Sequence, residues 1–257
     1  MTSAEQRVLF APEPLREPAT ILARPSALAA TRALWTLGAG VVAALLPPHL
    51  GQWVAWLGAP LAVSVVLDAG ALAALGTRPF GVYVHVPFCA TRCGYCDFNT
   101  YTAGELGSSS SPESWQDAVA LELEAASRML APGRPVSTIF VGGGTPSLLG
   151  GDGLTRLLDA VRVHFDLSDD VEITTESNPE STSPEFFDDL RSAGFTRISL
   201  GMQSAARHVL KVLERQHTPG RPVAAAQEAM AAGFEHVNLD LIYGTPTETD
   251  DDLHASL

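Results

Sequence analysis

The chain has 257 residues, enough for one large domain or two small ones. Its formal net charge is −13 at pH 7, so it lacks the positive surface that a nucleic-acid partner requires. All three cysteines fall within eight residues, Cys89 to Cys96. That spacing is poor for disulfides and indicates a metal site in a reducing compartment, so we expect a cytoplasmic protein.

Residues 1–78 form an extension whose composition differs from that of the rest of the chain. Its first 32 residues carry Pro and Arg without a clear period and are predicted to be disordered. Residues 33–67 contain no Asp, Glu, Lys or Arg, and Pro47-Pro48 divides the apolar run. The longer piece, Trp53 to Leu75, reaches the ~20 residues that a membrane-spanning helix needs.

Two interpretations of this extension stay open. A poorly ordered or non-native start fits Asp68 and a composition dominated by Ala, Leu, Gly and Pro, and we favour it. The alternative is a membrane hairpin through residues 33–75 with arginines on the cytoplasmic side of both ends. A secretory signal is excluded because Arg78 and Pro79 offer no small-residue cleavage site. We therefore divide the chain into residues 1–78 and a folded domain over residues 79–257.

Beyond Arg78, short β-branched runs alternate with amphipathic stretches. The pattern predicts five strands, at Val82–Val86, Thr138–Val141, Val171–Thr175, Ile198–Leu200 and Val237–Ile242. Helices are expected to begin where a serine N-cap precedes a proline, at Ser111-Pro112 and Ser183-Pro184, and to end at Gly194 and Gly233.

An internal repeat supports an α/β fold. Residues 193–200 (AGFTRISL) recur as residues 232–239 (AGFEHVNL), and each copy ends a helix and opens a strand. Alternating strands and helices predict a parallel sheet, and five strands are too few for a closed eight-stranded barrel. We expect a partial, open barrel. Thr249 and the acidic residues 250–252 indicate a last helix with about two turns. We therefore expect the chain to be truncated before a further strand and a further domain. We also expect it to be poorly soluble.

The cysteine motif carries the strongest chemical signal. Cys89, Cys93 and Cys96 have the spacing C-x3-C-x2-C directly after the first predicted strand. Three thiolates on a tight loop can hold three irons of a cubane and leave the fourth iron open. A structural zinc site would need a fourth ligand, for which His85 is the obvious candidate, and this alternative is much weaker.

The motif, with Gly81-Val-Tyr-Val-His-Val-Pro-Phe before Cys89, resembles the radical S-adenosylmethionine (SAM) signature of the oxygen-independent coproporphyrinogen III oxidase-like family. The resemblance runs from about Pro79 to the C-terminus. It implies a partial (β/α)6-type radical SAM barrel, a [4Fe–4S] cluster whose open iron binds SAM, and an electron donor that reduces the cluster.

Further motifs follow the predicted strands, where barrel proteins place their sites. By resemblance, the glycine segment meets the amino group of SAM, Arg215 pairs with its carboxylate, and Glu176 accepts from its ribose hydroxyls. Asp240 is expected to meet a ligand because a buried carboxylate needs a partner. The full set of SAM-site residues that the resemblance implies is Tyr83, Tyr95, Gly143, Gly144, Thr145, Glu176, Gln203, Arg215 and Asp240. Packing is a serious alternative for the two tyrosines.

Two functions compete within the family. The oxidases place a fourth cysteine two positions after the third, where this chain has Phe98, and Asp97-Phe98 resembles the bacterial heme chaperone branch. The favoured function is therefore a heme chaperone that delivers heme to a recipient hemoprotein. The alternative is oxidative decarboxylation of coproporphyrinogen III. His217 and His236 are available imidazoles, but no heme ligand is assigned.

Overall fold

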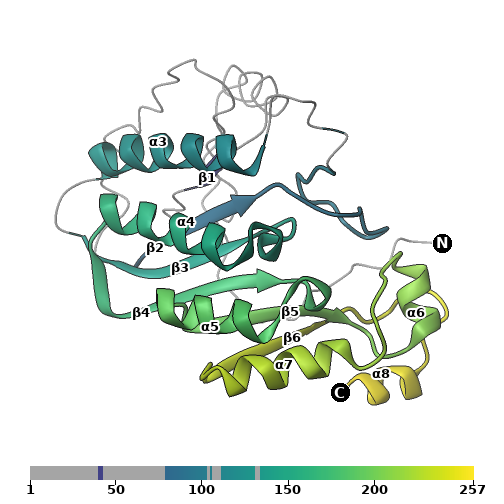
Figure 1. Ribbon diagram of the computed structural model, residues 1–257. Coiled ribbons are helices and arrows are strands. Elements are labelled where there is room, and N and C mark those ends of the chain that lie inside the picture. The colour runs from purple at the N-terminus through teal and green to yellow at the C-terminus, as the bar shows by residue number, and fades with distance from the viewer. Residues whose placement is uncertain (1–39, 43–78, 103–104, 106–110, 131–133) are drawn as a thin grey trace, which may run out of the picture.

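The computed structural model describes residues 40–42, 79–102, 105, 111–130 and 134–257 (Figure 1). Most of the extension lies outside these residues, and so does the choice between a membrane hairpin and a poorly ordered start. Its described part is strand β1 (Gly40–Val42), which pairs antiparallel with β2 (Phe80–Val86). No helix within the described ranges is long and apolar enough to cross a membrane.

A six-stranded sheet organises the domain, with its strands in chain order. After β2 come β3 (Val136–Gly143), β4 (Leu167–Ser177), β5 (Arg197–Gln203) and β6 (His236–Leu241), and each pairs in parallel with the strand before it. All five predicted strands are confirmed. The parallel order also confirms the α/β class and is consistent with a partial barrel.

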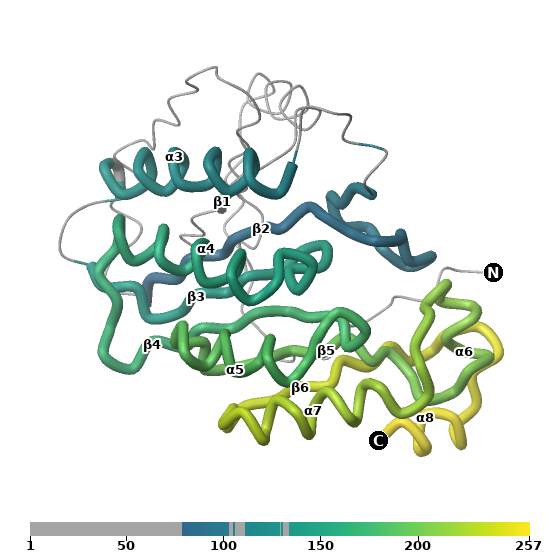
Figure 2. Tube along the Cα trace, in the orientation of Figure 1, coloured from purple at the N-terminus to yellow at the C-terminus, as the bar shows by residue number. Residues whose placement is uncertain are grey.

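Four helices connect the strands and lie beside one another along the sheet (Figure 2). They are α3 (Pro112–Leu130), α4 (Gly150–His164), α5 (Pro184–Ala193) and α7 (Arg221–Ala231). Shorter elements follow the strand ends: η1 (Pro146–Leu149), η2 (Pro179–Ser181), α6 (Arg207–Val212) and α8 (Asp250–Ser256). The loops on which we expect the site therefore gather at one end of the sheet.

The two faces of the sheet have different chemistry. Val82, Val84 and Val86 are at most 2% exposed and join the apolar core with the helices. Because successive side chains of a strand point to opposite faces, Tyr83 and His85 face away from that core. The second face is therefore polar, and it is the face on which ligand-binding groups can be presented.

The expected helix boundaries are also found. The Ser183 hydroxyl accepts from the Phe186 N–H at the start of α5, and Gly194 ends that helix with φ 102°, which glycine adopts without steric cost. The two copies of the internal repeat become neighbours in the sheet, because Ile198 lies opposite Val237 and Leu200 opposite Leu239. The two copies of the repeat thus form equivalent helix-to-strand connections that lead into neighbouring strands.

The last helix, α8, begins at the predicted Thr249. The Thr249 hydroxyl accepts from the Asp252 N–H, while the Asp252 carboxylate accepts from the Thr249 N–H, which makes a complete capping box. None of the residues of α8 is buried. Polar contacts join it to the α6 region, including one of 3.2 Å between His208 Nε2 and Asp252 Oδ2.

Candidate functional site

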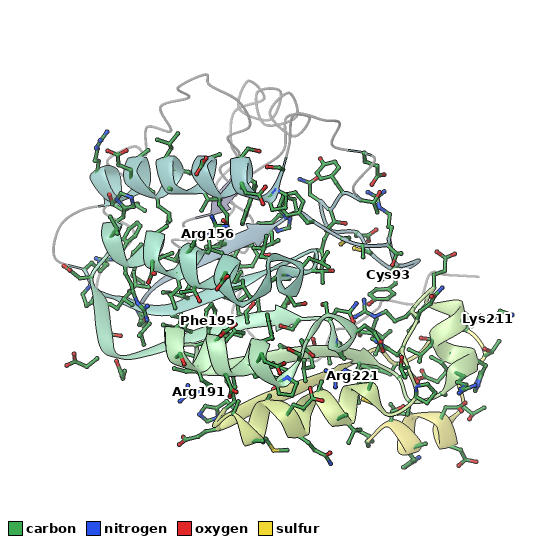
Figure 3. All side chains as sticks on the ribbon, viewed as in Figure 1. Cys93, Arg156, Arg191, Phe195, Lys211 and Arg221 are labelled. Atoms are coloured by element: carbon green, nitrogen blue, oxygen red, sulfur yellow. The ribbon has the colours of Figure 1, made fainter. Side chains whose placement is uncertain are left out.

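The cysteine loop leaves the carboxyl end of β2 and is fixed at both of its sides. The Cys89 N–H donates to the Tyr101 carbonyl, and the Tyr101 N–H donates to the Pro87 carbonyl, so the loop closes on itself. The Gly94 N–H donates to the Leu213 carbonyl at 3.1 Å. Figure 3 shows Cys93 on the part of this loop that reaches toward the α6 region. Two separate segments of the chain therefore hold the motif in place.

Each of the three half-buried thiols has a polar neighbour. The Thr145 hydroxyl lies 3.8 Å from the Cys89 sulfur, and Arg215 Nη1 donates to the Cys93 sulfur at 3.4 Å. The Cys96 sulfur lies 3.9 Å from the Thr100 hydroxyl. Burial raises the pKa of the Cys89 thiol, and the two threonine hydroxyls only partly oppose this effect. A positively charged metal centre would favour the thiolates instead.

The three thiols supply the number of protein ligands that a cubane with one open iron takes, one thiolate at each of three irons. Within the described part of the chain, no group of three or more His, Cys, Asp or Glu side chains is placed as the ligands of one metal ion would be. His85, the candidate fourth zinc ligand, has its Nε2 2.9 Å from the Asn99 carbonyl and its Nδ1 3.1 Å from the Tyr83 hydroxyl.

The glycine run at the end of β3 lets the backbone approach the cysteine loop. The Gly144 N–H donates to the Val86 carbonyl and the Thr145 N–H to the Phe88 carbonyl, both at 2.7 Å. A Cβ at Gly144 would lie 2.5 Å from the Phe88 carbonyl oxygen, and Gly143 has φ 111°. Glycine is therefore required here by the protein's own packing. The predicted contact of this segment with SAM stays a prediction.

Glu176, at the end of β4, is the most strongly shifted carboxyl of the site. Burial raises its pKa to about 7, and the Asp240 charge adds to the increase. The Gly143 N–H donates to Glu176 Oε2 at 2.9 Å and partly offsets the effect of burial. The end of β4 is thus tied to the glycine run, and its carboxyl exchanges a proton near neutral pH.

Asp240, on β6, faces the same side of the sheet and has a partner within the protein, while its predicted contact with a ligand stays a prediction. The Ser199 hydroxyl donates to Asp240 Oδ1 at 2.8 Å, so the protein itself supplies a partner. Burial nevertheless raises the pKa of this carboxyl, against the Ser199 and Asn238 hydrogen bonds and the charges of Arg197 and Arg215. A ligand is therefore not needed to explain why Asp240 is there.

Gln203 and Arg215 meet at Gly201 on β5. The register of β5 against β6 shifts between Gly201 and Gln203, and Gln203 has φ 69°, which is unusual for a residue other than glycine. Arg215 Nη2 donates to the Gly201 carbonyl at 3.0 Å. A Cβ at Gly201 would lie 2.9 Å from both Arg215 Nη2 and Gln203 Nε2. The bulge and the glycine together make room for these two side chains.

The two tyrosines are each packed in the protein. Tyr83 stacks on Phe140, and burial strongly raises its pKa. Burial also raises the pKa of Tyr95, where the neighbouring Arg215 charge acts against it and Cys93 acts with it. Tyr95, a residue of the cysteine loop itself, therefore lies near Arg215. For both tyrosines the predicted contact with SAM stays a prediction.

The structure adds His217, to which the sequence reasoning gave no role. Arg215 Nε donates to His217 Nε2 at 3.1 Å. The spacing Arg-x-His alone gave no sign of this contact, because it arises where the chain turns after α6. Among the sequence-predicted residues, contacts join Cys89 to Thr145, Cys93 to Arg215, and Gly143 to Glu176.

A parallel α/β sheet with three cysteines on the loop after its first parallel strand defines a class of protein. The profile of the radical SAM superfamily matches residues 83–257, and the chain belongs to this superfamily. Membership implies a [4Fe–4S] cluster and SAM as cofactors, for which the Cys89, Cys93 and Cys96 motif is present.

Among individual relatives, the heme chaperone HemW of Mycobacterium tuberculosis is 63% identical over 187 residues, which cover 72% of this chain and 47% of the relative. HemW of Escherichia coli is 40% identical, and the match covers 66% of this chain and 44% of the relative. The solved structure of the E. coli coproporphyrinogen III oxidase HemN matches with a TM-score of 0.65 and 31% identity, over 74% of this chain and 44% of that one. The chain thus spans about half the length of the curated relatives it matches.

Proposed function

We propose that this protein is a heme chaperone-like radical SAM protein that holds a [4Fe–4S] cluster and SAM and delivers heme to a recipient hemoprotein. The observation that carries the proposal is the 63% identity to a heme chaperone over 187 residues that include the cysteine motif. The heme chaperones of M. tuberculosis and E. coli match at 63% and 40% identity, against 32% for the E. coli oxidase. The three cysteine thiols of this protein are compatible with the reducing environment of the cytoplasm.

In this proposal the cysteine loop holds the cluster through Cys89, Cys93 and Cys96. When bound, such a cluster supplies an open iron for SAM and one-electron chemistry from an external electron donor. The guanidinium of Arg215 lies at the Cys93 sulfur, so a SAM carboxylate at the cluster would meet a planar pair of N–H donors. Glu176 offers carboxylate oxygens to ribose hydroxyls, while Tyr95 shields the loop from water.

The remaining SAM-site residues take positioning roles in the same proposal. Gly144 and Thr145 fix the end of β3 through the backbone hydrogen bonds to Val86 and Phe88, and the Gly143 N–H donates to Glu176. Gln203 presents both a donor and an acceptor from the bulge in β5. Asp240 adds negative charge near Glu176, and Tyr83 supports His85 beneath the loop.

The second candidate is coproporphyrinogen III oxidation, which the likeness to the E. coli oxidase structure supports. Phe98 argues against it, because by family resemblance the oxidases have a cysteine there. The Phe98 side chain is 65% exposed, so a cysteine would fit at this position without repacking. The fold therefore does not explain why position 98 lacks a cysteine.

One experiment separates the two functions. The protein is reconstituted anaerobically with iron and sulfide, then titrated with heme while the heme absorbance is followed. A parallel sample receives coproporphyrinogen III, SAM and a low-potential reductant, and the decarboxylated product is quantified. Stoichiometric heme binding without decarboxylation supports the chaperone. Multiple turnovers of coproporphyrinogen would establish the oxidase instead, and failure of both assays would reject the proposed function.

A further inference from the structure

The turn after α6 carries Arg215 into the site and fixes its backbone. The Arg215 N–H donates to the Leu210 carbonyl and the Glu214 N–H to the Lys211 carbonyl, as in a helix-ending Schellman motif. Glu214 has φ 52° in the position that glycine usually occupies. The side chain of His217, two residues after Arg215, is only 2% exposed. The turn therefore buries an imidazole directly behind the guanidinium.

The hydrogen bond between these two side chains determines the tautomer of His217. Arg215 Nε can only donate, so His217 Nε2, at 3.1 Å, must accept and cannot carry a proton. A neutral imidazole then carries its proton on Nδ1, which lies 3.8 Å from Glu180 Oε1. The opposite tautomer would point two donors at each other and a lone pair at a carboxylate. Electrostatics therefore favours the Nδ1–H form.

Glu180 is itself held in place. The Thr218 N–H donates to Glu180 Oε1 at 2.7 Å, and the Thr218 hydroxyl donates to Oε2 at 3.1 Å. Arg221, at the start of α7, donates to the Pro179 carbonyl and so fixes η2, on which Glu180 sits. The negative charge behind His217 is thus anchored to both η2 and the segment before α7.

Arg215 has five N–H groups, and three of its partners lie within the protein. Nε donates to His217, Nη1 to the Cys93 sulfur and Nη2 to the Gly201 carbonyl. Each Nη atom keeps one further N–H. Since His217 occupies Nε, the side-on edge of the guanidinium is closed to a ligand. A carboxylate can therefore meet only the remaining N–H groups, one on Nη1 and one on Nη2.

We propose that His217, backed by Glu180, is a positioning residue that fixes the guanidinium of Arg215 and presents its remaining N–H groups to the carboxylate of SAM. The inference deepens the proposed function and rests on the SAM site assigned there. Burial, followed by the Arg215 charge, lowers the pKa of His217, while the Gly201 carbonyl and Glu180 act in the opposite direction. The lowered pKa favours the neutral imidazole, the form that can accept a hydrogen bond.

The test compares two substitutions in the reconstituted full chain. His217→Phe keeps a ring but removes the acceptor, and His217→Gln keeps an acceptor oxygen of similar reach. We expect SAM to bind about tenfold more weakly to His217→Phe, as loss of one charge-assisted hydrogen bond implies, and His217→Gln to recover most of the affinity. His236→Gln, at an exposed histidine, is the matched control.

The outcomes separate the inference from the proposed function. If the wild-type protein binds SAM and His217→Phe binds it equally well, the positioning role is wrong while the SAM site stands. If the wild type itself fails to bind SAM, both are wrong. Should His217→Phe not fold, nitrogen-15 NMR of the wild-type imidazole decides the matter without any variant. A protonated Nδ1 and unprotonated Nε2 support the inference, and the reverse overturns it.

Discussion

Replacing Glu176 by Gln should change how the stability of the fold depends on pH. Its pKa rises from an ordinary 4.5 to about 7 in the folded protein, chiefly because of burial. The unfolded chain releases this proton near pH 4.5 and the folded chain near pH 7, so between these values the folded state binds one proton more. Stability therefore falls as pH rises across this window, by roughly 3 kcal/mol in all. Glu176→Gln removes this loss and keeps an acceptor for the Gly143 N–H.

The assay is denaturant unfolding of the metal-free protein at several pH values between 4.5 and 8.5. Other groups titrate in both proteins, so the difference between wild type and Glu176→Gln isolates this carboxyl. We expect the difference to be smallest near pH 4.5 and to favour the variant by about 3 kcal/mol above pH 8. Glu235→Gln, at an exposed position, is the control. Parallel stability profiles for wild type and Glu176→Gln would refute the reasoning.

Two further predictions concern the loop and its support. Gly144→Ala should destabilise the fold by about 1–3 kcal/mol in denaturant unfolding, because the new Cβ would lie 2.5 Å from the Phe88 carbonyl; an unchanged midpoint would contradict this. Cys96→Ser should lower the iron content of the reconstituted protein at least tenfold, whereas Phe98→Ala on the same loop should leave it unchanged. Equal iron in the cysteine variant would show that Cys96 is not a ligand.

The strands were predictable because their core-facing residues are apolar and β-branched. The predicted ranges were mostly too short, since the polar face interrupts the apolar pattern at the ends. Strand β4, predicted as Val171–Thr175, extends from Leu167 to Ser177 and so includes Glu176 itself. Helix ends were predictable where a local residue determines them, as with Ser183 and Gly194. Such signals act over a few residues and need no knowledge of the tertiary fold.

The internal geometry of the site was not predictable in the same way. The bulge at Gln203 and the pairing of Asp240 with Ser199 depend on the register of β5 against β6, which a strand pattern does not specify. The contact of Arg215 with His217 depends on a non-glycine residue, Glu214, in the left-handed region. Motifs could predict which residues belong to the candidate site. The hydrogen-bond partners of these residues depend on the strand register and could not be predicted.

The most direct test of the central claim is EPR spectroscopy of the anaerobically reconstituted and reduced protein, with and without SAM. A radical SAM site with Cys89, Cys93 and Cys96 as ligands predicts a [4Fe–4S]+ signal that shifts when SAM is added, because the ligand reaches the open iron. A protein that takes up zinc in place of iron, or a cluster signal that is indifferent to SAM, would contradict the account.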